Sequence, residues 1–348
     1  MAIKIFVIGV TGYIGGDAFY EIHNAHPEIE YTCLVRNSDK GAQVASQYPK
    51  VRLVYGDLDS VEILEEEAKK ADIVMNLADC DHLVGVNALI KGISSQQRET
   101  PAFLIETSGT GILLYEDMQR KVLGEPSEKT YDDWEGISTM ISFPDDAPHR
   151  HVDKVVIAAD NGSMIRTVIV CPPTIYGPGR GPGNKRGHQI YELARATLTL
   201  KHGVQIGKGE AVWTEVHIWD LSNVYIKLVE AAISGGGKAT WGTEGYYFTE
   251  NGFFKWGDAA KWVATAAHKQ GFLQQDYVKQ ISGEEADKLS QQGSVMWGAN
   301  SRGKAIRARK ILGWEPKERS LKDEVDDVVA SEAKEMGLVK GHAEKILN

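Results

Sequence analysis

The chain has 348 residues, of which 42% are hydrophobic and 25% charged, a composition typical of a globular protein with a full hydrophobic core. Its formal net charge of −9 argues against nucleic-acid and membrane-surface partners, because both are bound through an excess of Lys and Arg. No apolar run approaches the roughly 20 residues that span a bilayer. The three cysteines, Cys33, Cys80 and Cys171, show no metal-ligand spacing, so we expect reduced thiols, no metal and a cytoplasmic location.

The chain begins with a strand, a glycine turn and a helix. Residues 5–16 read IFVIGVTGYIGG, so a β-branched run leads into Gly9-x-x-Gly12-x-x-Gly15 and then into a helix predicted over Gly16–Asn24. Glycine suits such a turn because a Cβ would block both the bend and the close approach of the backbone to a pyrophosphate. The helix N-terminus adds free N–H groups for the phosphates. The turn therefore predicts a dinucleotide site, the alternative being a glycine-rich turn of another α/β protein.

Strand-like and helix-like segments alternate through the first half of the chain. The strands are short and almost continuously apolar, which is typical of strands buried on both faces of a parallel sheet. We therefore expect an α/β fold with a Rossmann-type doubly wound parallel sheet and ligands at the carboxyl ends of its strands. The predicted strands are Ile3–Ile8, Tyr31–Val35, Val51–Tyr55, Ile73–Leu77, Phe103–Glu106 and Thr167–Cys171, and the further predicted helices are Lys40–Gln47, Val61–Lys70, Asp81–Ser94 and Val152–Asn161.

The alternation ends beyond Tyr176, at a run rich in Gly and Pro. We expect a nucleotide-binding core over residues 1–175 and a smaller C-terminal α+β lid over residues 176–348, with segments at about 212–248 returning to the core sheet. The segment Tyr115–His149 is long for a connection, and is either a functional loop or a surface insertion. The lid is predicted to contain helices at Gln189–Leu198, Asp258–Gln270 and Glu284–Gln291 and strands near Val216 and at Tyr246–Thr249.

Charged residues after the second strand indicate which dinucleotide is bound. Arg36 lies about 20 residues beyond the glycine turn, where this type of fold places the side chain that contacts the ribose. A guanidinium group there pairs with a 2′-phosphate, so with Lys40 nearby we expect NADP(H) in preference to NAD(H), which remains possible. The alternative is that Arg36 covers the adenine or points to solvent. Asp57, after the third strand, either accepts from the adenine amino group or caps a turn.

A series of motifs covers nearly the whole chain. In order, they are Gly9-x-x-Gly12-x-x-Gly15, Gly56-Asp57-Leu58, Asn76-Leu77-Ala78, Thr107-Ser108-Gly109, Pro172-Pro-Thr-Ile-Tyr-Gly-Pro178, Val216-His217-Ile218-Trp219-Asp220 and Leu312-Gly313-Trp314-Glu315-Pro316. The set resembles the extended short-chain dehydrogenase/reductase superfamily, specifically its NAD-dependent epimerase/dehydratase group. The run Val35-Arg36-Asn37 is similar to the atypical, NmrA-like branch.

The resemblance implies a catalytic apparatus with one member missing. It matches Ser108, Lys154 and Asn87 to the family's serine, lysine and asparagine. In this role Lys154 is also expected to bind the nicotinamide ribose. The family's tyrosine stands four residues before the lysine, but this chain has Arg150 there. Arginine cannot exchange a proton near neutral pH, because its pKa exceeds about 12.

Three explanations for the missing tyrosine remain open. His149 or His151 supplies the proton, because histidine titrates near neutrality, or both are solvated residues at a helix start. A tyrosine from elsewhere, such as Tyr131 or Tyr176, folds into the site. Otherwise the site carries out no redox chemistry.

The predicted site has a cofactor part and a catalytic part. The residues expected to bind the cofactor are Gly9, Thr11, Gly12, Tyr13, Ile14, Gly15, Arg36, Lys40, Asp57, Leu58, Leu77, Ala78, Lys154, Pro172 and Thr174, and those expected in catalysis are Ser108, Lys154, Asn87, His149 and His151. In the lid, Arg180, Asn184 and Arg186 either bind an anionic or hydroxylated substrate or are surface residues.

These patterns support two main functions. The first is an NADP(H)-dependent reductase or dehydrogenase of a small carbonyl or alcohol that uses an acid other than tyrosine. The second is a catalytically inactive NADP(H)-sensing regulator. An epimerase or dehydratase remains a further alternative, since the fold alone does not decide function. We expect a small-molecule substrate, no nucleic-acid or membrane partner, and a possible homodimer.

Overall fold

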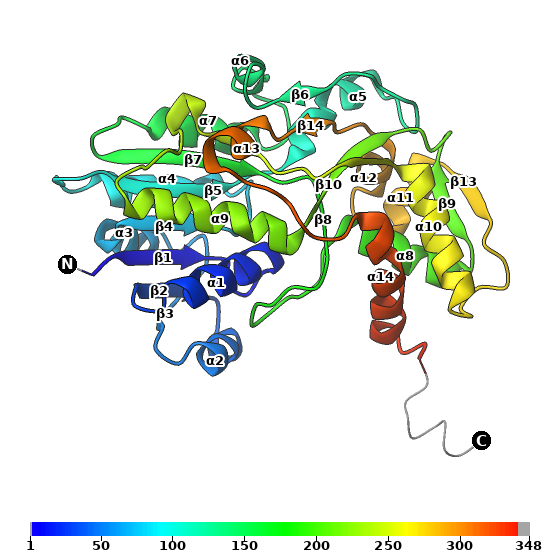
Figure 1. Cartoon of the computed structure of the whole chain (residues 1–348), viewed down its shortest axis with the longest axis horizontal. Coiled ribbons are helices and arrows are strands. Elements are labelled where there is room, and N and C mark those ends of the chain that lie inside the picture. The colour runs from blue at the N-terminus through cyan, green and yellow to red at the C-terminus, as the bar shows by residue number, and fades with distance from the viewer. Residues whose placement is uncertain (1, 340–348) are drawn as a thin grey trace.

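A seven-stranded parallel sheet forms the larger part of the molecule in the computed structural model, which describes residues 2–339 (Figure 1). Its strand order is β11-β7-β5-β4-β1-β2-β3, so the order reverses between β1 and β4, where such sheets bind ligands. The register places Ile8 beside both Leu34 and Asn76, which brings the carboxyl ends of three strands together. The strands are β1 (Lys4–Ile8), β2 (Glu30–Val35), β3 (Arg52–Tyr55), β4 (Ile73–Asn76), β5 (Ala102–Thr107), β7 (Ile165–Cys171) and β11 (Tyr246–Phe248).

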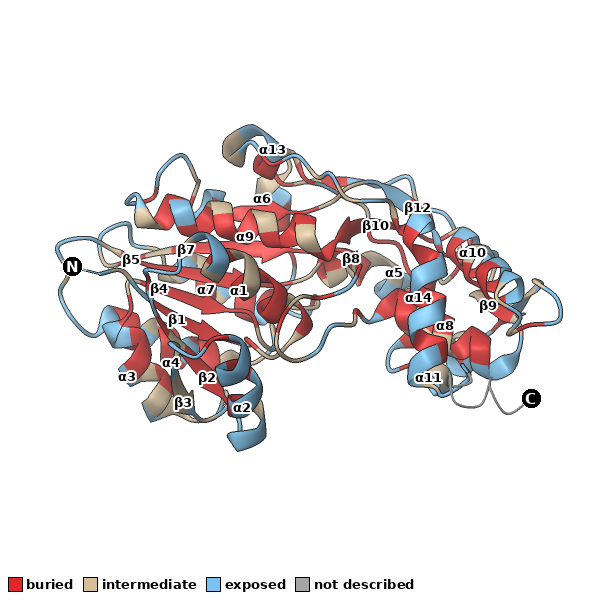
Figure 2. Ribbon diagram, turned by 60° about the horizontal axis from the view of Figure 1, so that its bottom comes forward, coloured by how far each residue is buried: buried red, intermediate tan, exposed pale blue. Residues whose placement is uncertain are grey.

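Helices cover both faces of this sheet, which explains why its central strands are apolar on both sides. One face carries α1 and α9, which pack against each other, and the other carries α3, α4 and α7 in succession (Figures 1 and 2). The expected Rossmann-type α/β fold is confirmed. The helices of this part are α1 (Tyr13–Ala25), α2 (Ser38–Gln47), α3 (Val61–Lys70), α4 (Leu83–Ser94), α7 (Arg150–Ala159) and α9 (Ile218–Ile233).

The C-terminal part has a second hydrophobic core, seen as the buried ribbon of α8, α10 and α14 (Figure 2), and it includes the buried Trp213 and Trp256. Small sheets pair β12-β10-β8 and β13-β9. The strands are β8 (Thr174–Tyr176), β9 (Gly203–Ile206), β10 (Val212–His217), β12 (Phe253–Lys255) and β13 (Val278–Ile281), and the helices are α8 (Gln189–Leu200), α10 (Trp256–Lys269), α11 (Gly283–Leu289), α12 (Gly293–Gly298) and α14 (Leu321–Glu335).

The chain passes between the two parts more than once. After β8 it enters the C-terminal part, then returns with α9 and with β11, which joins the edge of the large sheet beside β7. The long segment between β5 and α7 holds η1 (Thr110–Leu114), α5 (Tyr115–Arg120), β6 (Tyr131–Asp132) and α6 (Ile137–Met140). Strand β6 pairs with β14 (Gly303–Lys304), which precedes α13 (Ile306–Leu312), and η2 (Gly242–Glu244) precedes β11. Within residues 2–339, no helix combines the length and apolar character needed to cross a membrane.

Candidate functional site

A cavity of about 710 Å³, which we call the first cavity, lies at the sheet's carboxyl edge. Its floor is the glycine turn between β1 and α1, flanked by the residues that end β2 and β4. It lies at the strand-order reversal and has the size of a ligand pocket. Of the residues predicted to bind the cofactor, those that line it are Gly9, Thr11, Gly12, Tyr13, Ile14, Arg36, Lys40, Asp57, Leu58, Leu77 and Ala78.

The glycine turn is packed so closely that its first and third glycines admit no side chain. A Cβ at Gly9 would lie 2.5 Å from the Leu77 carbonyl oxygen, and Gly9 also has a φ of +93°. A Cβ at Gly15 would lie 2.3 Å from the Gly9 carbonyl oxygen, so Gly15 supports the turn from behind without lining the cavity. Helix α1 begins at Tyr13, and no side chain caps it at Gly12. Its first N–H groups are therefore available to a pyrophosphate, and the residues present fit a dinucleotide.

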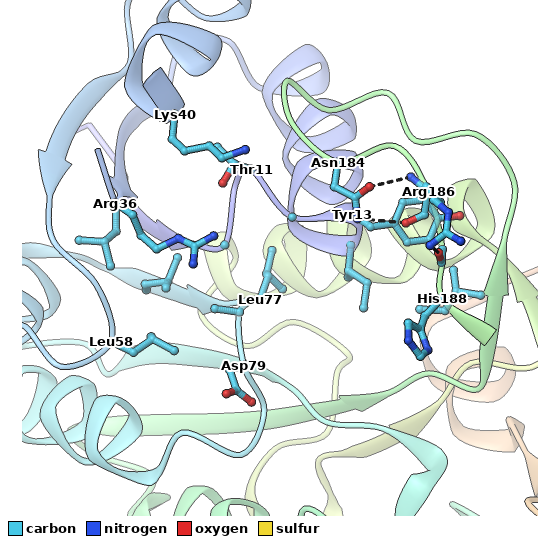
Figure 3. Close-up of a pocket in the computed structure, with 18 of the residues that line it drawn as sticks. Thr11, Tyr13, Arg36, Lys40, Leu58, Leu77, Asp79, Asn184, Arg186 and His188 are labelled. Atoms are coloured by element: carbon cyan, nitrogen blue, oxygen red, sulfur yellow. Dashed lines mark hydrogen bonds between the residues drawn. The ribbon is translucent and has the colours of Figure 1, made fainter. Parts of the chain in front are cut away.

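Two cations lie at one end of the first cavity. Arg36 and Lys40 extend into it from the end of β2 and the start of α2 (Figure 3). Across the described part of the chain, neither side chain forms an ion pair with a carboxylate. Asp57 lies beside them, but its Oδ1 accepts from the Ser60 hydroxyl at 2.8 Å, so its side chain also stabilises the local turn.

The other end of the first cavity differs from the expectation. Pro173 and Ile175 line it, whereas the predicted Pro172 and Thr174 are buried beside them. The lid contributes the segment 184–189, including His188, which enters the cavity opposite Asp79 (Figure 3). Sequence reasoning missed His188 and Asp79, which lie outside the recognised motifs.

The arginines of the lid form ion pairs with carboxylates. Arg186 lines the first cavity but pairs with Glu332 of α14 and, at 2.8 Å, with Glu192. Arg180 pairs with the buried Asp17 at 2.7 Å and lines neither cavity described here. Of the three lid residues singled out in the sequence, Asn184 and Arg186 therefore reach the first cavity, and Arg180 joins the lid to α1.

A second cavity, of about 810 Å³, lies between the core and the C-terminal part. Leu77–Asp79 line the first cavity and Asp81 lines the second, so the segment that follows β4 forms a wall shared by the two. Both predicted catalytic histidines, His149 and His151, line the second cavity.

His149 occupies a specially shaped position in that wall. Its Nδ1 lies 2.9 Å from Asp81 Oδ1 and 3.3 Å from Cys80 Sγ. Its Nε2 faces two glycines after β5, and a Cβ at Gly111 would lie 2.7 Å from it, so the glycine makes room for the ring. The His149 backbone has a φ of +63°, unusual for a residue with a side chain and frequent at functional sites.

Electrostatics keeps the His149 ring charged. Burial lowers the pKa of His149, but hydrogen bonds to Asp81 and Cys80 outweigh burial and raise that pKa to about 10. The same contact lowers the pKa of Asp81. Nδ1 of His149, Sγ of Cys80 and a carboxylate oxygen of Asp81 lie within 4.8 Å of one another. We interpret them as a hydrogen-bonded group, because the proton on Nδ1 already joins the closest pair.

Helix α7 presents different residues to the sheet from those that the sequence comparison implied. Arg150 is buried, but its guanidinium donates to the Phe143 and Ile141 carbonyls, and Lys154 is exposed on the surface, where it pairs with Asp145 at 2.8 Å. His149 and Asp153, also four residues apart, face the core instead. At this spacing, the pair that faces the core therefore lies one residue before the pair that the sequence comparison implied.

Asp153 lies in a buried polar group beneath the site. Its Oδ2 accepts from the Tyr246 hydroxyl at 2.9 Å, and Ser108 lies beside it. Burial raises the pKa of Asp153 to about 6, although the two hydroxyls act in the opposite direction. Ser108 is itself buried and lines neither cavity.

The remaining candidates lie elsewhere. Asn87 is exposed on α4 and lines neither cavity. Tyr176 donates its hydroxyl to the Arg319 carbonyl, and Tyr131 packs against Lys129, so neither replaces the missing tyrosine. Among the predicted catalytic residues, the structure brings only His149 and His151 to a cavity wall. The catalytic roles of Ser108, Lys154 and Asn87 stay predictions, without support from these positions.

The comparisons with known proteins agree with this architecture. No family model matches the chain. The oxidase ucsJ of Acremonium sp is 39% identical over 347 residues, a match that covers 97% of this chain and 100% of that protein.

Solved structures show the same fold at low sequence identity. The PbgP3 protein of Burkholderia pseudomallei superposes with a TM-score of 0.69 at 13% identity, over 98% of this chain and 100% of that one. The dTDP-glucose 4,6-dehydratase of Bacillus anthracis, solved in complex with NAD, gives a TM-score of 0.66 at 14% identity, over 96% and 97% of the two chains. The UDP-glucose 4-epimerase of Thermotoga maritima, solved with UDP-glucose, gives a TM-score of 0.65 at 15% identity, over 96% of this chain and 100% of that one. With 39% identity along almost its whole length, the chain belongs to the family of the Acremonium oxidase ucsJ and has the extended short-chain dehydrogenase/reductase fold.

Proposed function

We propose that the protein is an NADP(H)-dependent oxidoreductase of a small carbonyl or alcohol, in which His149 replaces the usual tyrosine as the proton donor. The observation on which the proposal depends is the shared wall: the dinucleotide cradle lies on one side of the segment after β4, and the Asp81–His149 pair lies on the other. When bound, the cofactor supplies or accepts a hydride. The protein then has to position both reactants and exchange one proton.

The cofactor preference rests on Arg36 and Lys40. Both cations extend into the end of the first cavity near β2 and β3 without a carboxylate partner within residues 2–339 (Figure 3). A guanidinium and an ammonium together suit a 2′-phosphate better than a hydroxyl, which favours NADP(H) over NAD(H). The dehydratase of Bacillus anthracis was solved with NAD, whereas these two cations lead us to expect the phosphorylated cofactor here.

The proton role rests on the geometry of His149. Asp81 holds its Nδ1, as a carboxylate does when it fixes the orientation of a catalytic imidazole, and Nε2 is directed towards the glycines after β5. Arg150 cannot replace it, because its guanidinium is buried against carbonyl groups and does not deprotonate. Because His149 and Asp153 replace the tyrosine and lysine at the same spacing, we also infer that the chain belongs to the atypical branch of its superfamily.

Two measurements test the function. Fluorescence titration should show NADPH binding more tightly than NADH, with the preference reduced in Arg36→Ala and retained in Lys279→Ala, which removes an exposed cation outside both cavities. NADPH consumption against a panel of carbonyl compounds should then depend on His149. Absence of NADPH binding, or turnover that is indifferent to His149→Gln, contradicts the proposal.

One observation favours a second candidate, a cofactor-binding regulator without turnover. Neither Ser108 nor Lys154, two residues that the family resemblance makes catalytic, lines a cavity. The substitution His149→Tyr separates the two candidates, because it restores the family's phenol at the position that faces the core. A wild-type protein that binds NADPH without turnover, and gains none in His149→Tyr, supports the regulator.

A further inference from the structure

We propose that the second cavity binds the substrate, and that this substrate is an apolar carbonyl compound carrying a protonated amine. The proposal rests on the proposed function only in assigning the reaction to His149. Binding of such compounds is measurable independently of any turnover.

The second cavity is built from both parts of the molecule. The core supplies Asp81 and His149, η1 and α5 supply Leu114 and Met118, and the C-terminal part supplies α12. The long segment between β5 and α7 therefore contributes two stretches of the wall, with Gly111, Leu114 and Met118 near its start and residues 145–149 at its end. Its volume of about 810 Å³ falls within the range of small-molecule pockets.

Six of the residues that line the second cavity are apolar. Leu114, Met118, Val295 and Met296 line it together with Ala147 and Pro148. Methionine side chains adapt to ligands of varied shape, and Met118 is exposed. A hydrophobic molecule would therefore cover apolar surface here and expose its reactive group to His149.

Four carboxylates also line the second cavity, together with the charged His149 ring. Asp81 is neutralised by His149 and Asp145 by Lys154. Asp146 accepts from the Tyr115 hydroxyl at 3.0 Å and Asp287 from the Ser294 N–H at 2.8 Å.

Asp146 also accepts from the Gln119 amide at 3.5 Å, and none of the three donors to Asp146 and Asp287 carries a charge. Throughout residues 2–339, no basic side chain pairs with either carboxylate. Two negative charges therefore remain available to a cationic ligand.

The same wall disfavours anionic ligands. No lysine or arginine is among the residues that line the second cavity, and the positive charge of His149 is paired with Asp81. A phosphate or carboxylate would have to enter beside uncompensated carboxylates, at an electrostatic cost. Sugar nucleotides such as UDP-glucose, with which the Thermotoga maritima epimerase was solved, therefore fit this cavity poorly.

The reaction is balanced with groups already described. Reduction of the carbonyl forms a C–H bond with the hydride of NADPH and an O–H bond with the proton of His149. NADPH is oxidised to NADP⁺, the carbonyl is reduced to an alcohol, and solvent returns a proton to the imidazole. The apolar body and the ammonium group would fix the orientation of the substrate against the wall.

Three matched ketones test the inference on the NADPH-loaded protein: 4-(aminomethyl)acetophenone, 4-methylacetophenone and 4-acetylbenzoate. They share one reactive group and differ in a charge of plus one, zero or minus one. We expect calorimetric affinity and kcat/KM to fall in that order. Replacing Asp146 or Asp287 by Asn should reduce the preference for the ammonium compound over the neutral one by about two- to fivefold each.

The matched control is Asp258→Asn, which removes an exposed carboxylate on α10 outside both cavities. It should leave the preference unchanged. Equal or tighter binding of 4-acetylbenzoate, no binding of the ammonium ketone, or insensitivity to Asp146→Asn and Asp287→Asn overturns the inference. Tight binding of the ammonium ketone without NADPH consumption supports the inference and counts against the oxidoreductase, so the two failures are distinguishable.

Discussion

His149 Nδ1 lies 2.9 Å from Asp81 Oδ1, a contact that joins the residue preceding α7 to the segment that follows β4. It forms in the wall shared by the two cavities, where a proton donor would meet both reactants. The contact depends on the left-handed backbone of His149 and on the absence of a side chain at Gly111. The predictions below test this arrangement and the cradle beside it.

The cation at the end of β2 should determine which cofactor binds. Replacing Arg36 by Ala should weaken NADPH binding by about 10- to 100-fold, because charge-assisted hydrogen bonds contribute about 1.5–3 kcal/mol. NADH binding should change little, because it lacks the 2′-phosphate. Titration of both cofactors checks this, and an equal loss for NADPH and NADH would show that Arg36 does not contact the 2′-position.

The pH dependence of stability should reveal the charged imidazole. The folded state raises the pKa of His149 from 6.5 to about 10. The charged ring therefore stabilises the fold fully below pH 6.5, and this stabilisation is lost as the pH rises from 6.5 to about 10. Asp81→Asn removes the partner responsible, so the difference in Tm from wild type should be largest near pH 6 and shrink towards pH 10. Buried carboxyls with raised pKa values, such as Asp153, are common to both proteins and cancel in the difference. A difference in Tm that is constant with pH would contradict the pairing.

The pH dependence of the reaction rate should also reveal the titration of His149. The rate of carbonyl reduction should hold through neutral pH and fall as His149 loses its proton near pH 10. In Asp81→Asn the fall should move to lower pH. Asp81 and Cys80 raise the pKa of His149, and the other titratable groups nearby are Asp153 and, on the far side of Asp81, His151. An unchanged profile in Asp81→Asn would exclude His149 as the titrating acid.

The glycine turn should tolerate no side chain at its first position. Gly9→Ala should destabilise the fold by about 2 kcal/mol or more and abolish cofactor binding, since its Cβ would collide with the Leu77 carbonyl as well as force a positive φ. Gly271→Ala is the matched control, because Gly271 has a φ of +81° with nothing within 4 Å of its Cβ. Denaturant unfolding of both variants separates the collision from the backbone strain. Equal losses of stability would mean that strain alone accounts for the effect.

Substitutions at two neighbouring positions of α7, Asp153 and Lys154, should have different effects. Lys154→Ala should leave NADPH binding and turnover within about threefold of wild type, because Lys154 lies on the surface with Asp145. Asp153→Asn, at the buried position, should lower turnover more strongly than it lowers cofactor affinity. A larger loss of turnover in Lys154→Ala than in Asp153→Asn would instead place Lys154 in the site, as the sequence comparison implied.

Much of the core was predictable because its signals are local. The strand Ile73–Asn76 is a continuous apolar run buried on both faces, and the glycine turn has a spacing that few other structures require. Helix α1 begins at Tyr13 and not at Gly16, because the Gly16 N–H already donates a helical hydrogen bond to the Gly12 carbonyl within the glycine turn. In the lid, α14 was missed, although Leu321, Val325 and Val329 recur at helical spacing and lie on its buried face.

The catalytic part could not be predicted to the same degree. With the tyrosine absent, only spacing identified the pair on α7, and spacing alone does not tell which residues of the helix face the core. A helical pattern was available, because Val152 and Val156 mark the buried face and Asp153 lies beside them, whereas Lys154 points away. The contact between His149 and Asp81 joins residues 68 positions apart in the sequence, so no local sequence pattern predicts it.

The most direct test of the central claim is a single-turnover experiment on NADPH-loaded protein mixed with 4-(aminomethyl)acetophenone, comparing wild type with His149→Gln. The control is His268→Gln, which changes an exposed histidine on α10. We predict stoichiometric NADPH oxidation by wild type and the control, and a rate lowered by about 10²- to 10⁴-fold in His149→Gln with unchanged NADPH affinity. Oxidation at the same rate in all three proteins, or NADPH bound by wild type and never oxidised, would contradict the account.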